Sequence, residues 1–251
     1  MKGGCLHDRR ATGILRLMQP SSSRVAEYKR AAALAAVAEV RDGMWLGLGT
    51  GSTAAFAVEE IGARLTAGTL RDVTGVATSE ATATLARRLG IPLAAHDSTR
   101  ALDLAIDGAD EVDPEGNLIK GGGGALLREK AVERRARRLV IVVDEGKLSA
   151  RLGTAFALPV EVERSAAAAE LAYCATLGCR PVQRGAEAAP FVTDNGNVIL
   201  DCRFAEGIAD ADALAALLDA RPGVRAHGLF LHMAHEVIFA GPMGLRHWRR
   251  S

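Results

Sequence analysis

The chain has 251 residues, 49% of them hydrophobic and 24% charged, which is the composition of a globular protein with one large domain, or one domain and a smaller one. Lys and Arg number 31 and Asp and Glu number 30, so a net charge of +1 leaves no large basic field for nucleic acid or an anionic membrane. Aromatic residues make up only 4%, which argues against base-stacking surfaces.

Residues 1–24 differ from the rest of the chain, with four arginines, a run of three serines and a single acid, Asp8. This composition is faintly like an organelle transit peptide, but no apolar face repeats through it. We therefore expect an N-terminal extension, either disordered or the product of a misplaced start codon, and we exclude it from the fold.

Short apolar runs and helical patterns alternate from residue 25 to residue 153. Helices are predicted at 25–40, 54–65, 80–89 and 125–138. Strands are predicted at 44–48, 73–78, 102–106 and 139–143. Strands that alternate with helices and are joined by short loops predict a parallel sheet covered on both faces, which is the arrangement of a Rossmann-like α/β domain.

Residues 154–230 follow a different order, β-α-β-β-α-β, which is that of a ferredoxin-like α+β domain. The elements expected there are strands at 158–163, 179–184 and 224–230, helices at 165–177 and 210–220, and a hairpin at 191–201 around Asn195-Gly196. A last strand at 236–240 is expected to return to the first sheet. The chain is thus predicted to have a catalytic domain of residues 25–153 and 231–251, with the smaller domain inserted into it.

Four predicted loops leave the carboxyl ends of the strands, where ligands of such sheets collect, at 49–53, 78–80, 107–113 and 144–147. The first of them joins a strand to a helix, and its glycines and helix-start amides suit a phosphate. It also fits the GxGxxG/A pattern weakly, with Glu80 placed to bind a ribose, so a nicotinamide cofactor stays open here. No GK[ST] follows, so the loop is not a Walker A motif, and a tight turn without a ligand is the plain alternative.

Four acids lie within seven residues at the end of the third strand: Asp107, Asp110, Glu111 and Asp113. Clustered carboxylates repel one another, which raises the pKa of at least one of them unless a cation is near. They are compatible with a metal site, with a solvated acidic turn, or with hydrogen bonding to sugar hydroxyls and acid–base chemistry. The calcium-loop pattern fails because Ala109 stands where a ligand belongs.

Lys120 is followed by four glycines and then by a predicted helix that holds Glu129. Four consecutive glycines cost backbone entropy on folding, so they indicate close approach of a ligand or a moving flap, with a plain linker as the alternative. Lys120 could stabilise an oxyanion, and Glu129 near the helix start could face the same pocket.

The cysteines, histidines and apolar runs of the sequence predict neither a metal site nor a membrane-spanning segment. His232 and His235 lack a third ligand in phase, so no metal site is predicted. No apolar run reaches the roughly 18 to 20 residues of a membrane span. The four cysteines form no CxxC pair and are too few for a disulfide framework, which predicts reduced thiols in a cytoplasmic protein: Cys5, Cys174, Cys179 and Cys202.

Six motifs together resemble the ribose-5-phosphate isomerase A family: GLGTGSTA (47–54), IDGADEVD (106–113), LIKGGGGALLREK (118–130), VVDEGK (142–147), LPVEV (158–162) and VTDNGNVILD (192–201). The likeness runs from about residue 26 to residue 241, and the six in this order are far more specific than any one. The resemblance implies an aldose–ketose isomerase that interconverts D-ribose 5-phosphate and D-ribulose 5-phosphate through an enediolate, without a metal or an organic cofactor. It also implies a homo-oligomer, a dimer or a tetramer.

The resemblance implies roles for individual residues as well. Glu129 would move the proton between C1 and C2, and Lys120 would stabilise the enediolate oxyanion. Asp107 and Asp110 would hold the hydroxyls and assist ring opening. The substrate-binding set would be Lys29, Thr50, Gly51, Ser52, Thr53, Gly108, Ala109, Gly121, Gly122, Gly123 and Lys147.

Four features depart from the family pattern, two of which are the N-terminal extension and a tail at 230–250 whose extra His and Arg residues could alter a subunit contact. Gly124 stands where an alanine is common, which would loosen the flap, and residues 185–190 lengthen a loop of the smaller domain. Two rival functions stay open from the residues alone. A nicotinamide-dependent dehydrogenase would bind NAD tightly, whereas a non-catalytic sugar-phosphate sensor would have no need of Lys120 and Glu129.

Overall fold

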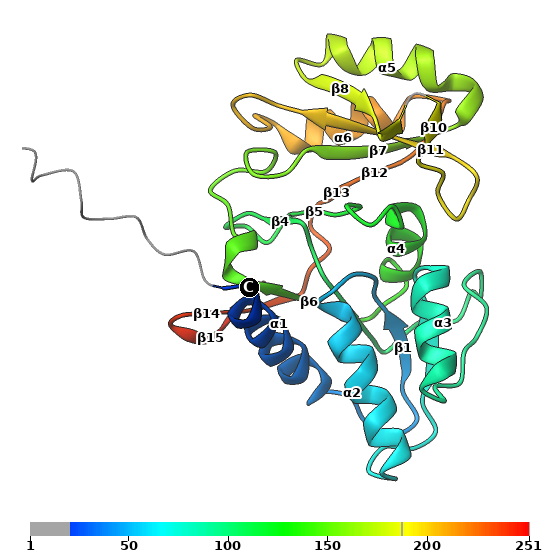
Figure 1. Ribbon diagram of the computed structural model, residues 1–251, viewed down its shortest axis with the longest axis vertical. Helices are drawn as coiled ribbons and strands as arrows, with labels where there is room; N and C mark the ends of the chain where they lie inside the picture. The colour runs from blue at the N-terminus through cyan, green and yellow to red at the C-terminus, as the bar shows by residue number, and fades with distance from the viewer. Residues whose placement is uncertain (1–20, 187, 251) are drawn as a thin grey trace, which may run out of the picture.

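The computed structural model describes residues 21–186 and 188–250, and residues 1–20 of the predicted extension lie outside this part of the chain. Its largest sheet has six strands in the order β15-β14-β6-β3-β1-β2 (Figure 1). Five of them run parallel, and β15 is antiparallel to β14 at one edge. The prediction of a Rossmann-like sheet to which the chain returns at its end is confirmed. The six strands are β1 (Trp45–Leu48), β2 (Thr74–Ala77), β3 (Leu104–Asp107), β6 (Leu139–Asp144), β14 (Glu236–Gly241) and β15 (Gly244–Arg249).

Both faces of this sheet are covered by other elements. Alternate side chains of each strand point to opposite faces, so the strands contribute apolar side chains to both sides. Leu46, Ile106 and Val142 pack against α1, α2 and α3, while Ile141 and Val237 pack against α4 and a three-stranded sheet, β13-β5-β4. The bounds of these elements are α1 (Ser22–Val37), α2 (Ala54–Thr66), α3 (Glu80–Arg88), α4 (Leu126–Glu133), β4 (Glu111–Val112), β5 (Leu118–Ile119) and β13 (Leu229–Phe230).

The smaller antiparallel sheet lies at the far end of the molecule from α1, α2 and α3 (Figure 1). Its strand order, β12-β7-β11-β8, with a helix after the first and third strands of the unit, confirms the ferredoxin-like prediction. We call residues 158–227 the small unit. Its elements are β7 (Leu158–Val162), α5 (Ala167–Thr176), β8 (Arg180–Gln183), β11 (Val198–Arg203), α6 (Ala211–Asp219) and β12 (Val224–His227), with a short ribbon of β9 (Gly185–Ala186) and β10 (Ala189–Pro190). Two 3-10 turns, η1 (Glu145–Lys147) and η2 (Arg164–Ala166), complete the described elements.

Most element boundaries lie within a few residues of the predictions, and four of the differences have a local reason. The first helix begins at Ser22 because the Ser21 side chain caps it, so the last residues of the predicted extension are helical. α4 ends at Glu133, five residues early, because the next residues bridge to the segment before β3. The strand predicted at 224–230 breaks at Gly228, and its two parts join different sheets. The predicted hairpin keeps its turn but only one bridge, Val192 to Val198, on its first arm.

Strand β15 was not predicted at all, because its two apolar side chains, Leu245 and Trp248, are three positions apart and so give no apolar alternation. In the described part of the chain, no helix combines the length and apolar character needed to cross a membrane.

Candidate active site

One cavity of about 110 Å³ opens beyond the carboxyl ends of β1, β3 and β6. The connections from β1 and β3 leave in opposite directions along the sheet, and such a switch point is where ligands of open parallel sheets bind. Fourteen of the fifteen predicted site residues line the cavity, and the fifteenth, Asp107, contacts this lining from behind. The lining residues are Lys29, Thr50, Gly51, Ser52, Thr53, Gly108, Ala109, Asp110, Lys120, Gly121, Gly122, Gly123, Glu129 and Lys147.

Asp107, at the end of β3, holds the loops around the cavity rather than facing it. Its side chain is 1% exposed, and Oδ1 accepts hydrogen bonds from the amides of Thr50 at 2.9 Å and Gly108 at 2.6 Å. Gly49 makes this approach possible, because a Cβ there would lie 2.2 Å from Asp107 Oδ1. The aspartate thus joins the loops that follow β1 and β3, and it reaches a substrate only through its neighbours.

Lys120, on the segment after β5, is a buried cation surrounded by carboxylates. Its side chain is 2% exposed, and Nζ lies 3.0 Å from Asp107, 3.1 Å from Glu133 and 3.8 Å from Glu129, while it donates to Gly108 O at 2.7 Å. Burial opposes the ammonium charge, but the three carboxylates outweigh burial and raise the pKa of Lys120 above its ordinary value. Lys120 is therefore a fixed positive charge at the cavity wall.

Glu129 lies in the first turns of α4, and burial raises the pKa of its carboxyl to about 8. Lys120 lowers this pKa, whereas Asp107 and Asp110 raise it. Its side chain is 6% exposed, and Oε2 has no hydrogen-bond partner among the described residues. A carboxylate with a raised pKa at a cavity wall, 3.8 Å from an ammonium, has the properties of a general base.

A second group of residues in the same lining suits an anion. Ser52 and Thr53 precede α2, whose start has no side-chain cap. The amides of Ala55 and Phe56 donate to the carbonyls of Gly51 and Thr53, which leaves the amides of Ser52, Thr53 and Ala54 for a ligand. Lys29 of α1 donates to Ser52 Oγ at 3.0 Å, and Lys147 of η1 lines the same cavity. Two cations and a helix start, in the same lining as a carboxylate and an ammonium, fit a small phosphorylated substrate.

Comparison with known proteins shows the family of the chain. A sequence profile of ribose 5-phosphate isomerase A (phosphoriboisomerase A) matches residues 74–244. The ribose-5-phosphate isomerase A of Chloroflexus aurantiacus is 52% identical over 226 residues, which cover 87% of this chain and 92% of that protein. The chain belongs to the ribose 5-phosphate isomerase A family. The predicted family, and the prediction of an enzyme of this family, are thereby confirmed.

Solved structures of the same family share the fold. A D-ribose-5-phosphate isomerase in complex with phospho-erythronic acid has a TM-score of 0.87 and 38% identity, and the match covers 90% of this chain and 99% of that one. The ribose 5-phosphate isomerase from Plasmodium falciparum also has a TM-score of 0.87, with 36% identity and the same coverage. A curated relative from Roseiflexus castenholzii is 53% identical over 219 residues, covering 87% of this chain and 93% of that protein.

The fourth glycine of the loop, at which the chain departs from the family pattern, is favoured here by packing. Gly124 has a φ of +82°, and a Cβ on it would lie 2.5 Å from the ring of Phe191. Both the backbone conformation and the contact disfavour a side chain, which would be strained here and would force the Phe191 ring to shift. Phe191 of the small unit packs directly against Gly124, and the expectation that Gly124 loosens the flap stays a prediction.

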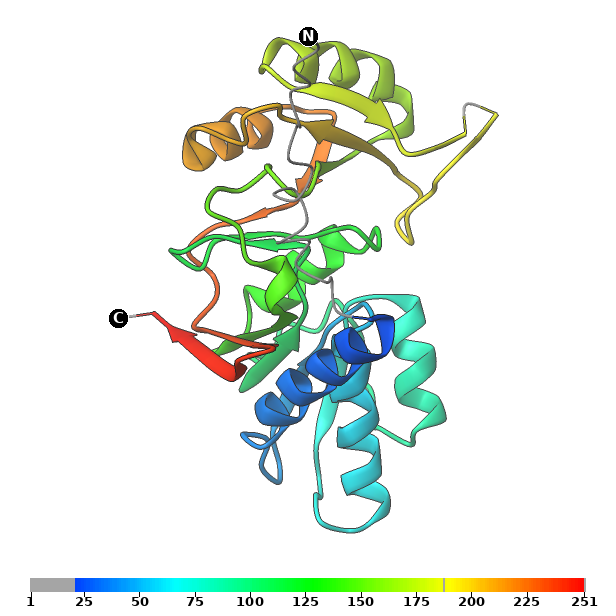
Figure 2. The same cartoon turned by 60° about the vertical axis from the view of Figure 1, so that its left-hand side comes forward.

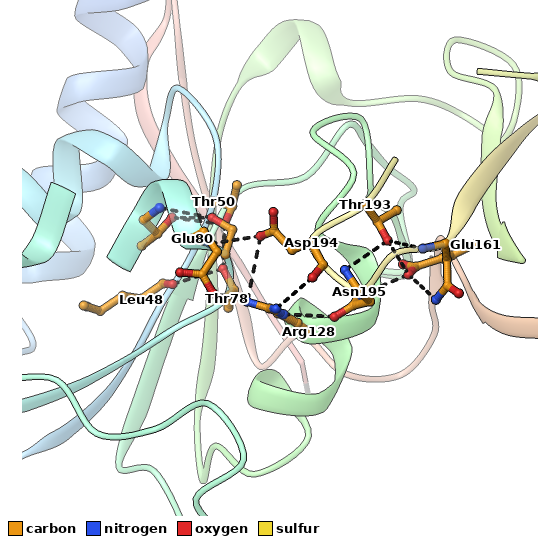
Figure 3. A network of polar contacts seen from close by, with 12 residues as sticks. Leu48, Thr50, Thr78, Glu80, Arg128, Glu161, Thr193, Asp194 and Asn195 are labelled. Atoms are coloured by element: carbon orange, nitrogen blue, oxygen red, sulfur yellow. Dashed lines mark hydrogen bonds and ion pairs between the residues drawn. The ribbon is translucent and has the colours of Figure 1, made fainter. Parts of the chain in front are cut away.

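A polar network crosses from the cavity to the small unit (Figure 3). Arg128, next to Glu129 on α4, donates to Glu80 Oε1 at 2.7 Å, to Asn195 Oδ1 at 3.0 Å and to Asp194 O at 3.1 Å. Glu161 of β7 in turn accepts from Asn195 Nδ2 at 3.1 Å. The segment around residues 190–197, yellow in Figures 1 and 2, reaches from the small sheet towards α3 and α4. Because the Glu80 carboxylate is paired with Arg128, it is engaged in this network and does not support the ribose contact of the dehydrogenase alternative.

Sequence reasoning missed three groups of residues around the site. Arg128 looks like an ordinary helix arginine, and only its position beside Glu129 signals a role. Glu133, 3.1 Å from Lys120, follows Glu129 by one helical turn, a spacing that places both on one face. The third group holds Thr50 from behind through hydroxyl contacts of 2.7 to 3.1 Å: Thr78, Ser79 and Thr82.

Proposed function

We propose that the chain interconverts D-ribose 5-phosphate and D-ribulose 5-phosphate by metal-free proton transfer through an enediolate, as a step of the non-oxidative pentose phosphate pathway. One observation carries the proposal: the Glu129 carboxylate and the Lys120 ammonium lie 3.8 Å apart at the wall of a single cavity. The other cations of that lining, Lys29 and Lys147, supply an anchor for the phosphate. A homo-oligomeric, cytoplasmic enzyme with the two domains predicted above completes the proposal.

The groups divide the reaction between them. With the open-chain aldose bound, Glu129 takes the proton from C2, and the electron pair forms the C1–C2 double bond while negative charge develops on O1. Lys120 stabilises this oxyanion, a contribution worth about 10²–10³-fold for a single well-placed donor. The hydroxyl proton on O2 passes to O1, and Glu129 returns its proton to C1 to give the ketose. Asp110 holds the hydroxyls, and Asp107 acts through Lys120 and the loop amides.

Phosphate binding gives the enzyme a means to place C1 and C2. Interactions with a part of the substrate that does not react can hold the reacting carbons against the base, which removes much of the entropy cost of the encounter. Lys29, Ser52 and Lys147 are the groups that we assign to this task.

The direct test is an isomerase assay with ribose 5-phosphate on protein treated with a chelator and dialysed. Full activity is expected, with no binding of NAD. Activity lost with the chelator and restored by a divalent metal would overturn the metal-free mechanism. Tight NAD binding would favour the dehydrogenase, and ribose 5-phosphate binding without turnover would favour the sensor.

Lys147→Ala is expected to raise KM roughly 10- to 100-fold with a smaller change in kcat, because a hydrogen bond to a charged group is worth about 1.5–3 kcal/mol. The phosphate is held in the ground state and the transition state alike, so its loss weakens binding more than chemistry. Steady-state kinetics check this, with Lys147→Arg as the variant that keeps the charge. An unchanged KM in the alanine variant would count against phosphate anchoring.

The pH dependence follows from the raised pKa of Glu129. A carboxyl with a pKa of about 8 is protonated below that pH, so the base form accumulates as the pH rises. We expect kcat/KM to rise with pH and to level off above about pH 8, since this limb reports the free enzyme's base. A profile that is flat between about pH 6 and 9 would contradict the assignment.

A further inference from the structure

The small unit makes hydrogen bonds to the glycine-rich loop through the side chain of Arg184, which follows β8. Arg184 Nη1 donates to the carbonyl oxygens of Gly121 and Gly122, each at 3.0 Å. Asp201 of β11 holds the same guanidinium, accepting from Nε at 2.9 Å and from Nη2 at 2.5 Å. A planar guanidinium can pair with a carboxylate and still direct another N–H elsewhere, because it carries five donors in a fixed arrangement.

The loop that Arg184 holds also orients a residue of the cavity, Asp110. The amide of Gly122 donates to Asp110 Oδ2 at 2.7 Å, so hydrogen bonds run without a break from Asp201 in the small unit to Asp110 at the substrate cavity. The fit is tight, since a Cβ on Gly122 would lie 2.6 Å from Asp110 Oδ1. A shift of this loop would therefore move both the cavity wall and a carboxylate assigned to the sugar hydroxyls.

Phe191 makes a second contact with the same loop, through Gly124. The Arg184 guanidinium lies 5.7 Å from the centre of the Phe191 ring, so the two side chains form one surface against the loop. Arg184 is 17% exposed, which places most of its side chain out of water. Four consecutive glycines leave a chain segment with large backbone freedom, and these contacts from the small unit supply the constraint that the glycines lack.

We infer that Arg184 is a positioning residue of the isomerase reaction: it holds Gly121 and Gly122 so that the loop and Asp110 are in place before the sugar phosphate binds. The kinetic part of this inference rests on the proposed function, whereas the order of the loop is a property of the free protein. Placement of this kind matters because a displacement of about 1 Å near the chemistry can cost about 100-fold in rate. The small unit then contributes to catalysis by positioning the loop, although none of its residues lines the cavity.

The test compares Arg184→Met with Arg180→Met, a control that removes an exposed arginine from the other end of β8. In the free Arg184→Met protein we expect amide hydrogen exchange of residues 120–124 to become at least about 10-fold faster, with exchange in β11 unchanged. We expect kcat/KM for ribose 5-phosphate to fall at least about 10-fold, with Arg184→Lys intermediate because it keeps the charge and one donor group. Arg180→Met should match the wild type in both measurements.

Loop exchange or kcat/KM within about twofold of the wild type in Arg184→Met would overturn the inference, as would equal effects of the Arg180 control. If Arg184→Met does not fold, Arg184→Lys decides, and it must change both quantities at least about threefold. A wild-type protein without isomerase activity would overturn the proposed function, whereas an active wild type with an unaffected Arg184→Met variant would overturn only the role of Arg184.

Discussion

Replacing Glu129 by glutamine is expected to lower kcat at least about 100-fold and to leave KM little changed. General base catalysis contributes roughly 10²–10⁴-fold, and an amide of nearly the same shape cannot take the C2 proton. The loss should appear in kcat because the interaction is made with the transferring proton rather than with the bound sugar. Steady-state kinetics with ribose 5-phosphate measure both constants.

Glu133→Gln is the matched control for this substitution. Glu133 lies on the same helix, is 3% exposed and approaches Lys120 as closely as Asp107 does, but it does not line the cavity. We expect this variant to keep at least about a tenth of the wild-type kcat. A Glu129→Gln enzyme that keeps a third of the normal rate, or equal losses in the two variants, would remove Glu129 from the role of base.

Replacing Lys120 by methionine is expected to have the second largest effect, on rate and stability together. Loss of the oxyanion partner should lower kcat about 10²–10³-fold. The change also leaves Asp107, Glu129 and Glu133 buried without their cation, and breaking a buried ion pair costs roughly 3–5 kcal/mol. Since Lys120 lowers the pKa of Glu129, its removal should also move the acid limb of kcat/KM above about pH 8. Kinetics across pH and thermal unfolding check these results.

Lys130→Met separates the two effects, because Lys130 is another buried lysine of the same region. It donates to His227 O at 2.7 Å and Leu229 O at 2.9 Å and ties α4 to β12 and β13, away from the cavity. We expect Lys130→Met to be destabilised, with kcat and the pH profile close to those of the wild type. If it loses as much activity as Lys120→Met, general destabilisation rather than oxyanion stabilisation explains both.

The cavity wall could be predicted from the sequence because its chemistry is concentrated in short segments at strand ends. Residues 49–53 and 107–110 each follow a buried apolar strand, and parallel strands bring their carboxyl ends to one edge. Lys120 and Glu129 lie close in sequence, and a loop followed by a helix start is enough to turn both towards one pocket. Family resemblance then supplied the individual roles, which composition and spacing alone had left open.

The residues that hold this wall could not be predicted, because their partners are distant in sequence. Arg184 and Gly121 are separated by 63 positions, and Arg128 and Asn195 by 67, so no local pattern links them. The burial of Asp107 could not be predicted either, because it also depends on a residue that is distant in sequence. An aspartate at a strand end faces either the ligand or the next loop, and the choice depends on the close approach of Gly49 across the sheet.

The central claim is that the Glu129 carboxylate carries the proton between C2 and C1, and isomerisation in D₂O followed by NMR tests it most directly. After many turnovers the wild-type enzyme should place deuterium at C2 of ribose 5-phosphate and at C1 of ribulose 5-phosphate, and Glu129→Gln should do so at least about 100-fold more slowly. Sugar phosphates interconverted with no deuterium on carbon would indicate hydride transfer, and exchange at the wild-type rate in Glu129→Gln would assign the proton to another group. Either result would contradict the account.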